Sequence, residues 1–171
     1  TLVLARDGCV APYFIAVSDR ADDPEGLVRQ GNEWVCGARL ADAAFFFAHD
    51  RETPLAECAT ALERLTFHQS LGSFAVKSDA VDRLAGSPPF VALGVESPAD
   101  LRRAIQLAKA DLTTAMVAEF SELQGVMGGI YARLDGESEP VWQAIYDQYQ
   151  PAGAEGSVPR GTVGAVLGVA D

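Results

Sequence analysis

Apolar residues follow a strand-like spacing only at the beginning of the chain. Residues 2–17, LVLARDGCVAPYFIAV, form two apolar runs on either side of Asp7-Gly8. An Asp-Gly pair between such runs is a strong signal for a β-hairpin, because both turn positions require positive φ. An isolated hairpin is at best marginally stable in water. We therefore expect residues 1–24 to be the hairpin and linker that end an upstream β-containing domain.

From residue 27 onward the apolar positions recur at helical spacing instead. Such spacing predicts helices, and Pro, Gly and Ser residues mark where they begin and end. We expect residues 25–171 to form a mainly α-helical bundle that is truncated at its C-terminal end. The helices are expected over residues 27–51, 54 to about 65, 78–85, 98 to about 120, 136–151 and 162–171, with a turn at Gly72 and a break at GSPPF, residues 86–90.

One stretch, EFSELQGVMGGIYARLDGE at residues 119–137, mixes glycines, acidic residues and large apolar side chains. Its glycines lack the preceding strand and the spacing of a dinucleotide-binding loop, and the chain contains no G-K-[ST] sequence of a phosphate-binding loop. Glycine also allows two backbones to approach closely. We therefore predict that Gly125, Gly128 and Gly129 form a packing joint between helices.

Composition and charge narrow the range of functions. The chain has 171 residues, of which 49% are hydrophobic, and a formal net charge of −11. The length and hydrophobic content suit one globular domain, or one domain plus a fragment of another. Because nucleic-acid affinity comes largely from neutralising phosphates, the charge argues against RNA binding over the whole surface, but not against a local basic face.

The cysteines and the apolar runs indicate a cytoplasmic protein. Cys9, Cys36 and Cys58 are scattered and odd in number, which is typical of reduced thiols rather than of a disulfide framework or a metal site. No apolar run approaches the ~18 residues that a membrane-spanning helix needs, and the first residues lack the pattern of a signal peptide. We expect no membrane partner.

The pair His49-Asp50, at the end of an apolar helical pattern, is similar to the signature of HD-type metal phosphohydrolases. Such a site needs an earlier His, the adjacent His-Asp and a later Asp, whereas the only other histidine, His68, follows the pair. We therefore interpret His49 as a residue at a helix C-terminus, where the helix dipole favours it. Trp34 and Trp142 occupy apolar helix positions and are expected in the core or at an interface.

Four strings along the chain resemble one family. Together they are similar to the middle of the beta subunit of bacterial heterotetrameric glycyl-tRNA synthetase, over nearly the whole chain. The resemblance implies an HD-related helical domain inside a much longer subunit. Lys77 matches the family, whereas its neighbours in VKSDA (76–80) and the pair Cys36-Gly37 depart from it. The four strings are GNEWVCGARLADAAFFFAHDRETPL (31–55), FHQSLGS (67–73), AKADLTTAMVAEFSELQGVMGGIYARLDGE (108–137) and GTVGAVLGVAD (161–171).

The resemblance also implies where the metal-binding residues of an HD site would lie. Asp111, Asp171 and His68 fall at those positions, while Ala110 stands where the histidine next to Asp111 would be. Losing an imidazole ligand weakens a metal site severely. We therefore expect a vestigial site without bound metal.

The activity implied by the resemblance is the ATP-dependent attachment of glycine to its tRNA by an alpha2beta2 complex. In this family the alpha subunit holds the adenylate-forming site and uses ATP and Mg, and the beta subunit recognises and positions the tRNA. No residue of this chain is then expected to be catalytic or to bind a cofactor. The candidates for contacts with tRNA phosphates are Lys109, Arg133 and Arg160.

Two other functions stay open from the sequence. One is a metal-dependent phosphohydrolase acting on nucleotides, with a divalent ion at Asp111 and Asp171. The other is a structural spacer, which joins the part of the subunit that binds alpha to a tRNA-binding C-terminus. The acidic net charge favours the spacer over direct contact with RNA.

Overall fold

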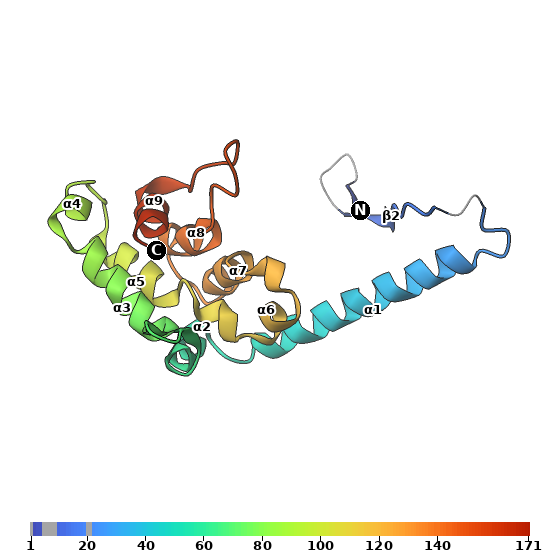
Figure 1. The fold of residues 1–171 in the computed structure, drawn as a ribbon, viewed down its shortest axis with the longest axis horizontal. Helices are drawn as coiled ribbons and strands as arrows, with labels where there is room; N and C mark the ends of the chain where they lie inside the picture. Colours follow the sequence, from blue (N-terminus) through green and yellow to red (C-terminus); the bar gives the residue numbers. More distant parts are fainter. Residues whose placement is uncertain (1, 5–9, 20–21) are drawn as a thin grey trace. The chain divides into compact units, whose positions relative to one another are not determined.

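The computed structural model describes residues 2–4, 10–19 and 22–171, and helices dominate it (Figure 1). The predicted mainly α fold class is therefore confirmed. At the start, β1 (Leu2–Leu4) pairs antiparallel with β2 (Val10–Phe14), with Leu2 opposite Phe14. The hairpin prediction is confirmed for the two strands, while the predicted Asp7-Gly8 turn lies outside the described residues.

The chain divides into two compact units, residues 1–44 and 45–171. The division falls inside α1 (Leu27–Asp50), a helix that agrees with the predicted one to within a residue. The domain boundary predicted after residue 24 stays a prediction, as does the HD type of the helical bundle.

Residues 45–171 form short helices and one small hairpin. In chain order these are α2 (Leu55–Thr60), η1 (Ala61–Glu63), β3 (Thr66–His68), β4 (Gly72–Ser73), α3 (Phe74–Ala85), α4 (Pro88–Val91), α5 (Pro98–Leu107), η2 (Ala110–Thr113), α6 (Ala115–Glu119), η3 (Ser121–Leu123), α7 (Val126–Leu134), α8 (Glu139–Asp147) and α9 (Gly161–Ala170).

The prediction of one long helix from residue 98 to about 120 is wrong. The helix α5 ends at Leu107, and η2 and α6 follow it as separate segments. The reason is a long-range contact. Asp50 accepts hydrogen bonds from the N–H groups of Ala115 and Met116, both at 2.9 Å. Asp50 therefore satisfies the first two amides of α6, and Oγ1 of Thr114 accepts the N–H of Val117, so α6 begins as a separate helix instead of continuing α5.

The predicted helix from residue 54 to about 65 is too long. It ends at Thr60, whose hydroxyl donates to the carbonyl of Glu57 at 2.7 Å. The chain then continues through η1 into β3, which pairs with β4 in a hairpin that the sequence analysis does not predict. Gly72 supplies the positive φ of this turn, at 94°, so the turn prediction is confirmed.

Two helix starts also differ from the predictions. The helix α3 begins at Phe74 rather than at residue 78, because Ser73 caps it by accepting a hydrogen bond from the N–H of Val76. The predicted break at residues 86–90 contains the short helix α4, since proline is well tolerated in the first turn of a helix.

The core of residues 45–171 lies among four helices. The helix α7 packs against α8, α8 packs against α9, and α5 packs against both α8 and α9 (Figure 1). Ser97 caps α5 as predicted, since its Oγ accepts a hydrogen bond from the N–H of Asp100. A carboxylate is present among the largest fully buried side chains, which are Leu107, Ile145, Leu167, Val141 and Asp111.

The predicted glycine joint is confirmed. Gly125 precedes α7 with a φ of 81°, which favours glycine. A Cβ on Gly128 would lie 2.9 Å from Cγ2 of Ile145. A Cβ on Gly129 would lie 2.5 Å from Cβ of Tyr146 and 2.8 Å from its Cα. Side chains do not approach so closely, so the contact between α7 and α8 requires glycine at both positions.

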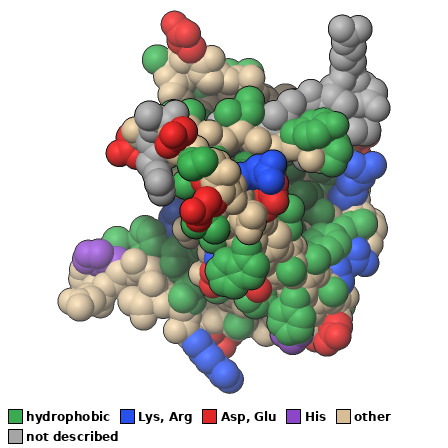
Figure 2. All heavy atoms as spheres, turned by 90° about the vertical axis from the view of Figure 1, so that its right-hand side faces the viewer, with side chains coloured by type: hydrophobic (Ala, Val, Ile, Leu, Met, Phe, Trp, Pro, Cys, Tyr) green, Lys and Arg blue, Asp and Glu red, His purple; other side chains and the backbone are tan. Residues whose placement is uncertain are grey.

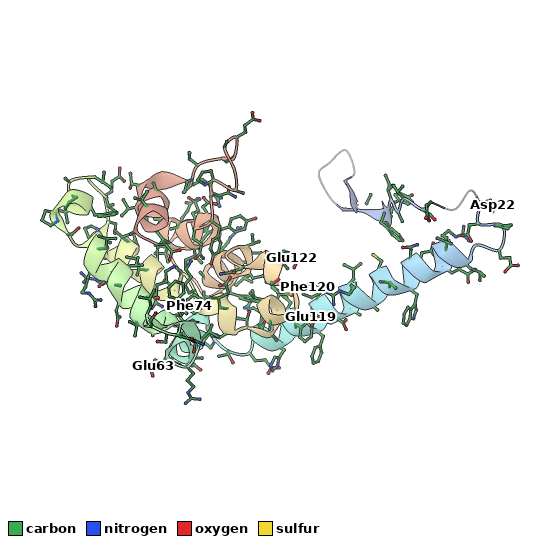
Figure 3. The ribbon with its side chains drawn as sticks, in the orientation of Figure 1. Asp22, Glu63, Phe74, Glu119, Phe120 and Glu122 are labelled. Carbon is green, nitrogen blue, oxygen red and sulfur yellow. The ribbon has the colours of Figure 1, made fainter. Side chains whose placement is uncertain are left out.

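The acidic residues around this joint have different environments. Glu119, the last residue of α6, and Glu122 in η3 are both exposed (Figure 3). Asp135 instead accepts a hydrogen bond from the N–H of Leu55 at 2.7 Å. This bond ties the end of α7 to the start of α2. The stretch 119–137 therefore contacts α8 through its glycines and α2 through Asp135.

Several smaller predictions concern the surface. Within the described part of the chain, no helix combines the length and hydrophobicity that crossing a bilayer requires. Cys36 and Cys58 are free thiols, and Cys9 lies outside the described residues. Trp34 is 77% exposed, so it is not a core residue, and its place at an interface stays a prediction.

Candidate functional site

The structure brings Lys109 and Asp171, two of the predicted site residues, into direct contact. Lys109 stands between α5 and η2 and is 4% exposed. Its Nζ donates hydrogen bonds to Oδ2 of Asp171 at 2.8 Å and to the hydroxyl of Tyr149 at 3.1 Å. Lys77 of α3 contacts the other oxygen of Asp171, with Nζ 2.9 Å from Oδ1. One carboxylate therefore lies between two ammonium groups.

These contacts shift the ionisation of the groups involved. Burial acts to raise the pKa of Asp171, but the hydrogen bonds and positive charges of Lys109 and Lys77 outweigh it and lower that pKa. Burial raises the pKa of Tyr149, and the charges of Asp111 and Asp171 raise it further. Tyr149 is therefore a neutral phenol at neutral pH, and its ring lies 4.3 Å below the ammonium of Lys109.

Asp111 has a different task, which is to cap α7. Its Oδ2 accepts hydrogen bonds from the N–H groups of Gly125 at 2.6 Å and Gly128 at 3.0 Å, an arrangement that a helix N-terminus favours. The side chain is fully buried, and its Oδ1 has no hydrogen-bond partner among the described residues. Burial raises the pKa of Asp111 to about 6, although the two N–H groups and the charge of Lys109 oppose the shift.

His68 does not join these two carboxylates. It is exposed on β3, where its Nδ1 accepts a hydrogen bond from the N–H of Ser70 at 3.2 Å. The oxygens of Asp171 face ammonium groups, and the bonded oxygen of Asp111 faces backbone amides, so this set does not fit a divalent ion. Within residues 2–4, 10–19 and 22–171, no cluster of three His, Cys, Asp or Glu side chains could hold a metal. A vestigial HD site at these positions stays a prediction.

Asp50 organises several segments, although its sequence position indicates only that it neighbours His49. Its two oxygens accept the N–H groups of Ala115 and Met116, and Oδ2 also accepts the hydroxyl of Tyr131 at 3.0 Å. His49 lies in the last turn of α1, as predicted. The partners of Asp50 follow it by 65, 66 and 81 residues, so no local pattern could have revealed the contact.

Arg133 and Arg160, the other two candidates for tRNA contact, share one indole ring. Their guanidinium carbons lie 5.3 and 5.5 Å from the ring centroid of Trp142, within the range of cation–π attraction. Arg160 also lies 5.2 Å from the ring centroid of Tyr146. We call these four residues the arginine–tryptophan cluster. Their positions in the sequence do not predict that they meet.

The two arginines of this cluster differ in their ion pairs. Nε and Nη2 of Arg160 donate to Oδ2 and Oδ1 of Asp147 at 2.7 and 2.9 Å. Burial acts to raise the pKa of Asp147, but the hydrogen bonds and charge of Arg160 lower it. Arg133 is exposed near the end of α7 and forms no ion pair with any carboxylate that the structure describes. Arg133 is therefore the cation more available to a ligand.

Lys109, the third candidate for tRNA contact, is buried, so a phosphate could reach its ammonium only if Asp171 or Tyr149 moved. Its contact with tRNA stays a prediction. On the face shown in Figure 2, basic side chains are dispersed among acidic and hydrophobic ones rather than gathered in one patch. A contact with RNA on this face would therefore have to be local.

One family and several known proteins that are similar to this chain share one description. Residues 1–171 match the sequence model of the family described as "Glycyl-tRNA synthetase beta subunit". The chain is 46% identical over 171 residues to the glycine–tRNA ligase beta subunit of Chromohalobacter salexigens, covering 99% of the chain and 24% of that protein. It is 41% identical over 170 residues to that of Oenococcus oeni, covering 99% and 25%.

A third relative agrees with these two. The glycine–tRNA ligase beta subunit of Moorella thermoacetica is 44% identical over 168 residues, which cover 96% of the chain and 24% of that protein. The chain thus spans about a quarter of the length of the curated relatives it matches. Since the family model covers every residue of the chain, the chain belongs to the glycyl-tRNA synthetase beta subunit family.

Proposed function

We propose that this chain acts within a longer beta subunit in the ATP-dependent attachment of glycine to its tRNA. Its relatives are named glycine–tRNA ligase beta subunits, which supports the proposal. The chain would position the tRNA rather than make bonds. ATP and Mg would be used by an alpha subunit in an alpha2beta2 complex, which would act in the cytoplasm.

The observation that carries the positioning role is the arginine–tryptophan cluster. Two guanidinium groups stand over the indole of Trp142, beside the exposed ring of Tyr146. Arginine donates to phosphate oxygens in a fixed fork and also stacks on planar groups, and RNA-binding proteins use arginine and aromatic side chains in this way. The cluster therefore offers both contacts that an RNA strand accepts.

The net charge of −11 limits how this binding can work. A phosphate backbone is repelled by an acidic protein at long range, so attraction has to come from short-range contacts. Arg160 is already neutralised by Asp147, which leaves Arg133 as the main source of positive charge in the cluster. We therefore assign the first phosphate contact to Arg133.

A nucleotide phosphohydrolase is not favoured. That activity would need a divalent ion at Asp111 and Asp171, and these carboxylates are engaged by backbone amides and by two lysines. The spacer role is the outcome that a negative binding experiment would support.

The test uses the full-length alpha–beta enzyme. Arg133→Ala is compared with Arg102→Ala, which removes an exposed arginine of α5 that lies 3.5 Å from Asp82. For each variant, the KM for glycine tRNA in aminoacylation is measured over a range of salt concentrations, together with glycine-dependent ATP–pyrophosphate exchange, which does not need tRNA.

We expect Arg133→Ala to raise the KM for tRNA by roughly fivefold. The slope of log KM against log salt concentration should fall by about one, as the loss of one phosphate contact predicts. Pyrophosphate exchange stays at the wild-type rate, and Arg102→Ala changes neither quantity. If both variants match the wild type in KM and salt slope, the cluster does not contact tRNA and the chain is a spacer.

A further inference from the structure

Both lysines of the chain converge on one aspartate. The sequence contains 13 Lys and Arg residues, of which only Lys77 and Lys109 are lysines. Lys77 comes from α3, Lys109 precedes η2, and Asp171 directly follows α9. The remaining 11 cations are all arginines. The chain therefore uses lysine only where an ammonium contacts Asp171.

The geometry of this contact is that of a closed ionic centre. The ammonium groups bind opposite oxygens of the carboxylate, Lys77 at 2.9 Å and Lys109 at 2.8 Å. The side chains of Lys77, Lys109 and Asp171 are 19%, 5% and 17% exposed. Charges that are this far removed from water are stable only when they are paired and hydrogen-bonded, and here the hydroxyl of Tyr149 gives Lys109 a second acceptor.

We propose that Lys77 and Lys109 are the resident cations of this centre and take the place of a metal ion in joining α3, the start of η2 and α9 around Asp171. The inference goes beyond the proposed role in tRNA positioning and does not depend on it. In a metal-dependent helical domain a divalent cation would draw carboxylates from different helices together. Here two ammonium groups supply the same total charge of +2.

A divalent ion cannot be added to this arrangement at low energy. Each oxygen of Asp171 is already taken by an ammonium, and a metal at hydrogen-bonding distance from those ammonium groups would be repelled by both of them. Oδ2 of Asp111 holds the amides of Gly125 and Gly128, and its Oδ1, which has no hydrogen-bond partner among the described residues, would be a single ligand where a divalent ion takes several.

Lysine suits this role better than arginine. Its ammonium is a compact point charge with three donors that rotate freely, whereas a guanidinium is a broad planar fork. Two guanidinium groups would need more space around one carboxylate than the buried side of the centre provides, because Lys109 also packs on the ring of Tyr149 at 4.3 Å.

The experiment uses the full-length beta subunit and follows hydrogen exchange of peptides from α3 and α9, after treatment with chelator and after addition of Mn²⁺ or Mg²⁺. The same peptides are followed in Lys109→Met and Lys77→Met. The matched control is Arg102→Met, which removes an exposed ion pair with Asp82 on the same unit.

We expect neither chelator nor either metal to change exchange in the wild type. Lys109→Met leaves Asp171 half-paired and speeds exchange in both peptides by about tenfold or more, because breaking a buried pair is far more costly than breaking an exposed one. Lys77→Met, which removes the more exposed ammonium, has a smaller effect in the same direction, and Arg102→Met has none.

Two results would overturn the proposal. In the first, chelation speeds exchange of α3 and α9 in the wild type, or added Mn²⁺ slows it. In the second, both lysine variants exchange like Arg102→Met. If Lys109→Met does not fold, two measurements still test the proposal. They are the exchange of the wild type with chelator or added metal, and the exchange of Lys77→Met.

Discussion

The helices α1 and α7 both contain internal glycines, and these glycines have opposite surroundings. In α7, an added Cβ on Gly128 or Gly129 would lie 2.9 Å or less from Ile145 or Tyr146 of α8. In α1, an added Cβ on Gly31 or Gly37 would meet no atom within 4 Å outside the backbone of the helix. Glycine lowers the stability of a helix interior, and in α7 that loss is offset by close packing.

The comparison shows that a helical apolar pattern and burial are separate properties. The helix α1 is 24 residues long, yet none of its residues is buried, and Trp34 and Leu40 are among its exposed apolar side chains. The nine residues of α7 include five buried ones. Helices in water gain most of their stability from packing an apolar face, so the two helices draw on different sources of stability.

The largest expected effect comes from filling the joint in α7. Gly129→Ala would place a methyl group 2.5 Å from Cβ and 2.9 Å from the backbone N of Tyr146. Backbone cannot rotate away as a side chain can, so α7 and α8 must separate. We expect a loss of about 3 kcal/mol in local stability, measured as faster hydrogen exchange of α7 and α8 in the full-length protein.

Gly136→Ala is the control for Gly129→Ala, because it replaces a glycine of the same region with alanine without creating a steric clash. Gly136 follows α7 with a φ of 87°, and an added Cβ there would meet nothing within 4 Å. Gly136→Ala carries only the strain of a positive φ, about 1 kcal/mol. If Gly129→Ala lowers the local stability of α7 and α8 no more than Gly136→Ala does, these two helices do not pack as closely as described above.

The second prediction concerns the carboxylate beneath the same joint. Because burial raises the pKa of Asp111 to about 6, the folded state holds its proton more tightly than the unfolded state does. Its contribution to stability is therefore fully present below the unfolded pKa, near 4, and is lost as the pH rises through about 6. A shift of this size corresponds to roughly 2–3 kcal/mol.

The measurement is the pH dependence of the free energy of opening of α7 in the full-length protein, between about pH 4 and pH 7. Asp111→Asn keeps one oxygen for Gly125 and Gly128 but does not titrate, so its profile over this window is flatter than that of the wild type. Asp147 and Asp171 have lowered pKa values and act below this window. Identical slopes in the two proteins would show that Asp111 is ionised throughout.

The joint was predictable from sequence, whereas the caps around it were not. Three glycines within five residues indicate close packing wherever they occur in a helical region, because few other roles require them. Asp50, Asp111 and Asp135 cap elements whose amides lie 65, 14 and 80 residues away. Such partners depend on how the helices assemble, and for this reason the helix predicted to reach residue 120 is interrupted after Leu107.

The candidate site shows the same limit. The family resemblance predicts a role for Asp111 and Asp171, but it does not predict the pairing of Asp171 with two lysines. Lys109, Arg133 and Arg160 are predicted as phosphate contacts because they are cations, and nothing in the sequence places both arginines on Trp142. The residue types at these positions indicate charged contacts. Which residues contact one another is visible only in the folded structure.

The third prediction concerns Asp50, the last residue of α1. Asp50→Ala removes the acceptor of Ala115, Met116 and Tyr131. Losing a charged cap of this kind costs roughly 2 kcal/mol, so we expect α6 to exchange faster and α1 upstream of residue 44 to be unaffected. His49→Ala, next to it and exposed, is the control and leaves α6 unchanged. If α6 exchanges at the same rate in Asp50→Ala and His49→Ala, Asp50 does not stabilise the start of α6.

The smallest expected effect is a gain in stability at Gly31. Alanine there avoids the entropic cost of a helical glycine and meets no neighbour within 4 Å, so Gly31→Ala should stabilise α1 by about 0.5–1 kcal/mol. Hydrogen exchange of α1 in the full-length beta subunit measures it, with Gly37→Ala as a second site of the same kind. A loss of stability at both sites would mean that another part of the subunit packs against α1 as closely as α8 packs against α7. The two helices would then use their glycines for the same purpose.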